Sequence, residues 1–234
     1  MTLGRRERVR AATIVEITET ARKILIDEGP EAVTLRAIAR EMGMTAPALY
    51  RYFPSHAELV RHMVGTLFNE LTIALHTEIK AVPHADMRGK FLAATLTFRR
   101  WALEHRREYA LLFGTPFPGI EDVYTDDFAA ECGRQFGLTF LHLFEELWAG
   151  NPFPVPPEES LDPRLRVQLA RYRDSVGTAL PLGCMQFFLQ CWVRLQGAVS
   201  LEVFGHLAFA FDDPEPLFLL MLEEVATHIG LAKP

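Results

Sequence analysis

Positive charge is concentrated near the N-terminus of this chain. Residues 1–56 hold nine Lys and Arg against seven Asp and Glu, a net charge of +2, and the remaining residues hold fifteen against twenty-three, which is −8; together they give the −6 of the whole chain. Four arginines open the chain, either as a solvated tail or as part of this basic end. A basic end on an acidic body suits a protein that touches nucleic-acid phosphates at one end only. These arginines are Arg5, Arg6, Arg8 and Arg10.

Thiol, imidazole and carboxylate groups offer other chemistries, namely redox reactions, metal binding and acid–base catalysis. Cys184 and Cys191 are seven residues apart and so share one helix face, but free cysteines are commonly small buried apolar residues. The eight histidines are scattered, and none forms a metal-spaced pair with a carboxylate on one helix. Glu145 and Glu146 are expected on partly solvated surface. No nucleophile elbow, phosphate loop or dinucleotide fingerprint appears, so we expect no catalytic residue, no metal and no cofactor.

The composition also indicates where the chain resides. With 49% hydrophobic residues over 234 positions it can bury a sizeable core. Three cysteines indicate a reducing compartment, and the Arg-rich start lacks the apolar stretch of a signal peptide. The most apolar region, 180–211, is interrupted by Arg194, Glu202 and three glutamines, which favours a buried helix over a membrane span. We therefore expect a cytoplasmic protein with no membrane partner.

The elements that must position these groups are helices. Apolar residues recur at helical spacing with no clear strand pattern, which predicts an all-α fold. A first helix should end at Gly29-Pro30, while Thr34 and Thr45 can cap a second and a third helix on the two sides of Gly43. Two short helices joined by a glycine-containing turn make a helix-turn-helix. We assign residues 1–54 to a three-helix domain of this kind.

The segment 34–53 resembles the helix-turn-helix of the tetracycline-repressor (TetR) family of regulators. Its Leu-Tyr-x-Tyr-Phe ending, followed by a capped fourth helix, makes the resemblance more specific than a bare helix-turn-helix. The resemblance covers roughly the first 60 residues. The matching residues are Thr34, Arg36, Ile38, Ala39, Gly43, Thr45, Leu49, Tyr50, Tyr52, Phe53 and Leu59.

The resemblance implies that the third helix enters the major groove of double-stranded DNA. Ala46 and Pro47 can give only apolar contact, for example to a thymine methyl group. Base-specific hydrogen bonds would therefore come mainly from Arg36, Thr45 or Arg51. The implied DNA-binding residues are Arg36, Thr45, Ala46, Pro47, Tyr50, Arg51, Tyr52 and His56.

Aromatic residues at the end of this segment leave two interpretations open. Tyr50, Tyr52 and Phe53 could form an aromatic corner of the core; we adopt that interpretation for Phe53 and expect Tyr50 at a phosphate with its ring partly packed. Tyr52 is expected to contact the DNA backbone. His56 stands where family members often carry Lys, which weakens a phosphate contact at pH 7, although the helix terminus still offers N–H donors.

Residues 55–234 are expected to form one helical domain for ligand binding and dimerisation. The predicted helices cover 55–83, 86–108, 109–113, 123–149, 164–175, 182–206 and 216–229, with a proline-rich linker at 150–163. Segments 109–119 and 192–202 resemble one C-terminal subclass of the same family. That subclass usually shows Trp, His and Gly in the second segment, and here Gln196 stands at the His position.

The resemblance also implies a cavity for a small apolar ligand in this domain. Each large apolar side chain, taken on its own, is better explained as a core residue. As a group, many aromatic residues beside few charges match the lining of a ligand pocket. The candidates are Trp101, Phe113, Phe117, Phe144, Trp148, Met185, Phe188 and Trp192.

The helix at 182–206 is apolar nearly all round, which indicates burial against a second copy of the chain, with Leu195 and Val199 in the interface. In the family the last helices form the dimer interface, and a homodimer places two recognition helices about 34–36 Å apart on a palindromic operator. We predict a non-enzymatic repressor that a small apolar ligand releases from DNA. The alternatives are an activator or partner-regulated member, and a helical small-molecule-binding protein or enzyme with a helix-turn-helix-like corner.

Overall fold

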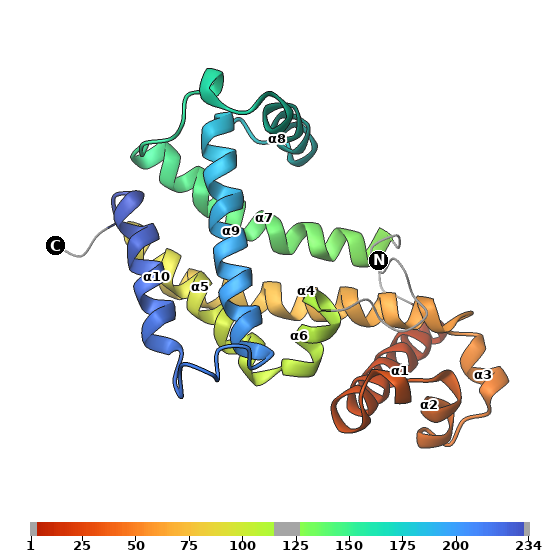
Figure 1. Ribbon diagram of the computed structural model, residues 1–234. Coiled ribbons are helices and arrows are strands. Elements are labelled where there is room, and N and C mark those ends of the chain that lie inside the picture. The colour runs from red at the N-terminus through yellow and green to blue at the C-terminus, as the bar shows by residue number, and fades with distance from the viewer. Residues whose placement is uncertain (1–3, 115–126, 232–234) are drawn as a thin grey trace. The chain divides into compact units, whose positions relative to one another are not determined.

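The computed structural model of the protein describes residues 4–114 and 127–231. Within these ranges the chain forms ten α-helices and two 3₁₀ turns, Pro30–Ala32 and Glu158–Ser160, and no strand (Figure 1), so the predicted all-α fold is confirmed. The helices are α1 (Arg5–Glu28), α2 (Leu35–Glu41), α3 (Ala46–Tyr50), α4 (His56–Ala81), α5 (Met87–Glu104), α6 (Arg106–Phe113), α7 (Asp127–Gly150), α8 (Pro163–Val176), α9 (Leu182–Val203) and α10 (Glu215–His228).

Local signals in the sequence explain where the first helices begin and end. Gly29, at the end of α1, has φ +96° and Gly43, in the turn after α2, has φ +63°, a backbone region that favours glycine. Thr34 caps α2, because its hydroxyl accepts a hydrogen bond from the Ala37 amide at 3.1 Å. Thr45 stands at the predicted N-cap of α3, but its side chain accepts no capping hydrogen bond.

Helix α1 begins earlier than its apolar pattern predicts, so the opening arginines lie on a helix and not in a tail. The amide of Gly4 donates to a Glu7 carboxylate oxygen at 2.8 Å, and this acidic residue sits in the first turn of the helix. A carboxylate there satisfies a free N–H group and favours the positive end of the helix dipole. The first turns of α1 are exposed, which is why hydrophobic periodicity does not reveal them.

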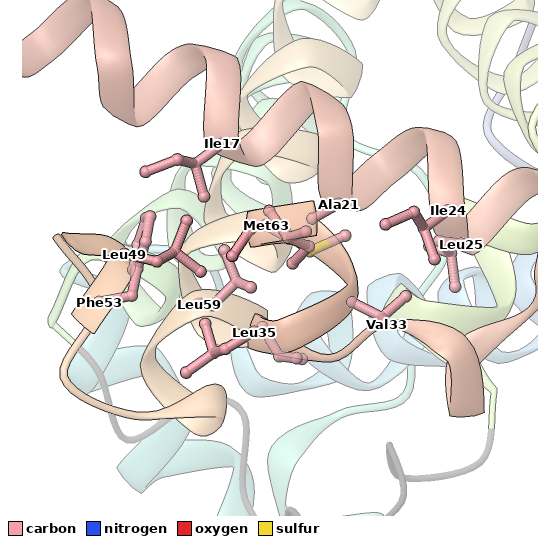
Figure 2. Packing of buried hydrophobic residues seen from close by; sticks show 13 residues of the cluster. Ile17, Ala21, Ile24, Leu25, Val33, Leu35, Leu49, Phe53, Leu59 and Met63 are labelled. Carbon is pink, nitrogen blue, oxygen red and sulfur yellow. The ribbon is translucent and has the colours of Figure 1, made fainter. Parts of the chain in front are cut away.

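The chain divides into two compact units, one of residues 1–70 and 105–135 and the other of residues 71–104 and 136–234. The first unit has a core that α1, α2, α3 and the start of α4 build together (Figure 2). Side chains such as Ile17, Leu49 and Leu59 are fully buried there. Burying one such side chain contributes about 1.5–3 kcal/mol, so the core fixes the two short helices that would be unstable alone.

Helix α6 belongs to the first unit, although the sequence suggested a boundary at residue 54. Arg22 of α1 forms ion pairs with Glu70 of α4 and Glu108 of α6. Arg107 of α6 also donates to the backbone carbonyl of Leu25 at 3.1 Å. These contacts between residues distant in sequence fasten α6 to α1, so the compact units do not follow the division that we expected.

The second unit is built around α9, which packs on α5 and α8. Trp192 of α9 lies among Phe98, Phe136 and Phe140, with its ring centroid 5.7–5.9 Å from each of theirs. Arg99 of α5 pairs with glutamates of α9 and α10 and so ties the three helices together. Among the described residues, no helix combines the length and the apolar character needed to cross a lipid bilayer.

Candidate nucleic-acid interface and ligand cavities

The helix-turn-helix of the first unit presents polar side chains to solvent. Arg36, at the start of α2, and Thr45, Tyr50 and Arg51, on and around α3, are all exposed, and Tyr50 is 49% exposed. Ala46 and Pro47, which can make only apolar contacts, are half-buried and exposed respectively. The opposite face of α3 is held by buried Leu49 of the core, so the donors are displayed on a fixed support.

Arg10 of α1 lies over the aromatic ring of Tyr52, with its guanidinium carbon 5.3 Å from the ring centroid. The same side chain donates to the backbone carbonyl of Arg51 at 3.3 Å. Sequence reasoning missed this packing of α1 on the end of α3, although the run of arginines was its signal. The result is an open, basic groove of about 650 Å³, lined by Arg5, Arg6, Val9, Arg10, Met44, Ala48, Arg51 and Tyr52.

His56, at the start of α4, is half-buried and not fully displayed to solvent. Its Nε2 lies 2.6 Å from the backbone carbonyl of Val33, which is an acceptor, so this nitrogen donates the hydrogen bond. The contact joins the start of α4 to the segment before α2. Phe53 is buried in the core of the unit, as we predicted.

Three of the predicted pocket residues, Phe144, Phe188 and Trp192, line one apolar cavity in the second unit. Its free volume is about 40 Å³, enough for a few water molecules and far below the roughly 300–1,000 Å³ of ordinary ligand sites. The aromatic side chains fill the space themselves. The cavity is also lined by Phe91, Ala94, Thr95, Phe140, Leu143, Leu147, Cys191, Arg194, Leu195, Met221, Leu222 and Val225.

The other pocket candidates do not line this cavity. Trp101 and Met185 are buried in the second unit, and Trp148 packs edge-on against Phe153 with ring centroids 5.2 Å apart. Phe113 belongs to the first unit and packs against Phe68 and Tyr109. Phe117 lies outside the described residues.

A second and larger hollow of about 540 Å³ lies among α4, α5 and α7, and sequence reasoning missed it. Its polar side chains on α7 recur with helical spacing, at 139, 142 and 146, which was a signal that one face of this helix is polar. The sequence does not show which helices pack opposite that face, because this depends on tertiary structure. The hollow is lined by His76, Ile79, Lys80, Val82, His84, Lys90, Thr139, His142, Leu143 and Glu146.

Buried polar groups line one side of this hollow. Lys90 is only 5% exposed, and its Nζ lies 2.6 Å from a Glu146 carboxylate oxygen and 3.4 Å from Nδ1 of His84. The Oγ1 of Thr139, itself buried, lies 3.1 Å from Nε2 of His76. Partial desolvation lowers the pKa of His76, although this residue is exposed overall, and the nearby positive charge of Lys80 acts in the same direction; both effects favour the neutral ring.

Cys184 and Cys191 lack the features of a reactive pair. Cys184 and Cys191 are buried and unpaired, and burial raises the pKa of each thiol to about 12. Among the described residues, no group of three or more His, Cys, Asp or Glu side chains could hold a metal ion.

Comparison with known proteins finds family matches for two parts of the chain. A sequence model described as "Bacterial regulatory proteins, tetR family" matches residues 17–63, and one described as "Tetracyclin repressor-like, C-terminal domain" matches residues 91–225. The HTH-type transcriptional regulator Rv1816 of Mycobacterium tuberculosis is 27% identical over 221 residues, which is 92% of each chain.

Solved structures share the fold over nearly the whole chain. The regulatory protein SCO4313 superposes with a TM-score of 0.74 at 28% identity, covering 96% of this chain and 100% of its own. A protein from Rhodococcus sp. RHA1 superposes with a TM-score of 0.68 at 20% identity, covering 94% and 95% of the two chains, and shows the same fold.

Proposed function

This chain belongs to the TetR family of bacterial transcription regulators, and from that premise we propose that it is a repressor that binds a palindromic operator as a homodimer. A small ligand with apolar groups, bound in the second unit, releases it from DNA. Its place of action is the cytoplasm, where the operator lies.

The observation that supports this proposal most strongly is the display of donors on α2 and α3. Arg36 and Arg51 provide guanidinium groups for a guanine or phosphates, and Thr45 and Tyr50 provide hydroxyl groups. All four are exposed on helices whose other faces are buried in one core. Because the support is rigid, these side chains can meet DNA without a large cost in ordering.

In the proposed dimer, a second copy of the chain would cover an apolar surface on α9 and α10. These two helices run beside each other (Figure 1), and the rings of Phe187 and His228 stack between them with centroids 4.4 Å apart. Val193 is 68% exposed and Leu220 is 58% exposed, and exposed apolar patches mark association sites. Leu195 and Val199, which we expected in the interface, instead face the chain's own core. Other exposed apolar residues of this surface are Leu201, Phe204, Leu217 and Leu219.

Helix α4 provides a route from ligand to DNA. It runs unbroken over His56–Ala81, and its residues up to 70 belong to the first unit while those from 71 belong to the second. A ligand that displaces the C-terminal part of α4 would therefore move the helix-turn-helix attached to its start. Because both half-sites must be engaged together, a shift of a few Å would weaken the complex.

The test is fluorescence anisotropy with labelled DNA that flanks the protein's own gene. We expect saturable binding that weakens steeply with salt, because phosphate contacts release counterions. Absence of binding at low salt would instead favour the alternative of a helical small-molecule-binding protein or enzyme.

A further inference from the structure

We infer that the hollow among α4, α5 and α7 binds the carboxylate of a small organic acid, whose apolar part reaches toward the neighbouring aromatic cavity. This inference rests on the proposed function, because it names the chemical class of the ligand that would release the repressor. It differs from the sequence prediction, which placed a small apolar ligand among large apolar, mainly aromatic side chains.

The volumes of the two cavities favour the polar hollow as the place where the ligand first binds. The hollow has a free volume of about 540 Å³, which falls in the range of small-molecule sites, whereas the aromatic cavity has about 40 Å³. A ligand can therefore occupy the hollow without any change in the conformation of the side chains that line it. Entry into the aromatic cavity requires those side chains to move.

The groups around the hollow are mainly hydrogen-bond donors. Lys80 is an exposed ammonium group, and the histidines 76, 84 and 142 can each donate from a ring nitrogen. The ammonium of buried Lys90 carries three N–H groups, of which one points to Glu146 and a second faces Nδ1 of His84. A carboxylate is an acceptor with about four lone-pair sites, so it complements this lining.

The charges around the hollow select an anion of one charge. Among the lysines and glutamates that line it, Lys80 and Lys90 against Glu146 give a net charge of +1. Glu146 is paired with Lys90 at 2.6 Å, which leaves the charge of Lys80 for a ligand. A monoanion balances it, whereas a dianion such as a phosphate monoester would leave one negative charge uncompensated near Glu146.

The apolar part of the ligand follows from the wall that the two cavities share. Leu143 lines both of them. Phe91 and Leu147 line the aromatic cavity and directly follow Lys90 and Glu146, which line the hollow. A carboxylate held in the hollow can thus direct a short alkyl or aryl group toward apolar side chains.

The hollow also explains how such a ligand would act on DNA binding. His76 and Lys80 belong to the last turns of α4, the helix that begins beside the helix-turn-helix. An anion drawn to these residues would engage α4 directly. A neutral apolar molecule would lack this attraction.

The experiment is calorimetry of the full-length protein with octanoate, octan-1-ol and octyl phosphate. We expect octanoate to bind, octan-1-ol to bind at least about tenfold more weakly, and Lys80→Gln to weaken octanoate about tenfold. Lys23→Gln, an exposed lysine of the other unit, is the matched control and should leave octanoate binding unchanged. Equal affinity for the acid and the alcohol, tighter binding of octyl phosphate, no binding of any probe, or wild-type affinity in Lys80→Gln would overturn the inference.

A second readout separates this inference from the proposed function. Anisotropy of the operator complex is measured with and without octanoate. If octanoate binds specifically but does not release DNA, the acid site is supported and its proposed role in induction is refuted. If the protein binds the operator but has no affinity for octanoate, the DNA-binding function is supported and the acid site is refuted.

Discussion

The Nε of Arg22 lies 3.1 Å from a carboxylate oxygen of Glu108, although the two residues are 86 positions apart in the sequence. The same guanidinium donates to Glu70 at 2.6 Å. Glu108 is 3% exposed, and a buried carboxylate is tolerated only where a charged partner and hydrogen bonds compensate its lost hydration. This one arginine therefore holds α1, α4 and α6 together in the first unit.

We predict that Arg22→Met lowers the free energy of unfolding by about 3 kcal/mol, because it leaves Glu108 buried without its partner. Urea denaturation followed by circular dichroism would measure the loss. Lys23→Met is the matched control: it removes a neighbouring but exposed ion pair, to Glu41, and should change stability little. Similar losses in the two variants would contradict the distinction between buried and exposed pairs.

Two glycines should respond in opposite directions to replacement by alanine. Gly43 has φ +63°, so Gly43→Ala should lower stability by about 1 kcal/mol through backbone strain, although no atom lies within 4 Å of the added methyl group. Gly137 lies inside α7 with similar open space, and Gly137→Ala should raise stability by about 0.5–1 kcal/mol. Thermal unfolding of both variants checks this, and a stabilised Gly43→Ala variant would show that the turn is not strained.

The extent to which the sequence predicts this structure depends on how local each signal is. The ends of α1 and α2 follow from Gly29, Thr34 and Gly43, which act within one turn of the backbone, and these predictions are confirmed. The start of α1 was missed because Arg5 and its neighbours are exposed and carry no hydrophobic period. Its capping depends on a single contact to Glu7.

Features that arise from packing between distant segments could not be predicted from the sequence. The polar hollow exists because three helices bring His76, Lys90 and His142 together. Similarly, α9 is apolar on several faces, so its pattern could not tell buried Leu195 from exposed Val193. The pocket residues Phe144, Phe188 and Trp192 were predicted as a group and lie together, while Phe113 belongs to the other unit.

Replacement of the proposed DNA contacts should weaken operator binding without unfolding the protein. Arg36→Ala and Tyr50→Ala should each cost about 1–3 kcal/mol of binding free energy, because both side chains are exposed donors of the helix-turn-helix. Arg40→Ala removes an exposed arginine of α2 outside the proposed contacts and serves as the control. Anisotropy titrations at physiological salt are the measurement; wild-type affinity in both variants would refute the assignment.

The thiols of Cys184 and Cys191 should be inert in the folded protein. Burial raises the pKa of each to about 12, so at pH 8 only about one thiol in 10⁴ is a thiolate, the form that reacts. With Cys132→Ser, we expect no fast reaction with Ellman's reagent at pH 8 and the release of two equivalents after denaturation. Rapid labelling of the folded variant would revive a redox role for this pair.

The last prediction joins dimerisation to DNA binding through α9. Val193 is 68% exposed on the apolar surface proposed for the second copy, so Val193→Glu should leave each chain folded while placing a charge in the interface. We expect a monomer in sedimentation velocity at micromolar concentration, with helical content unchanged. Operator affinity should fall by more than tenfold, because a monomer engages one half-site and loses the advantage of two linked contacts. Leu195→Glu provides the contrast: this residue is 6% exposed in the chain's own core, so its variant should lose stability and helical content together. A Val193→Glu protein that remains dimeric, or a wild-type protein that sediments as a monomer, would place the interface elsewhere.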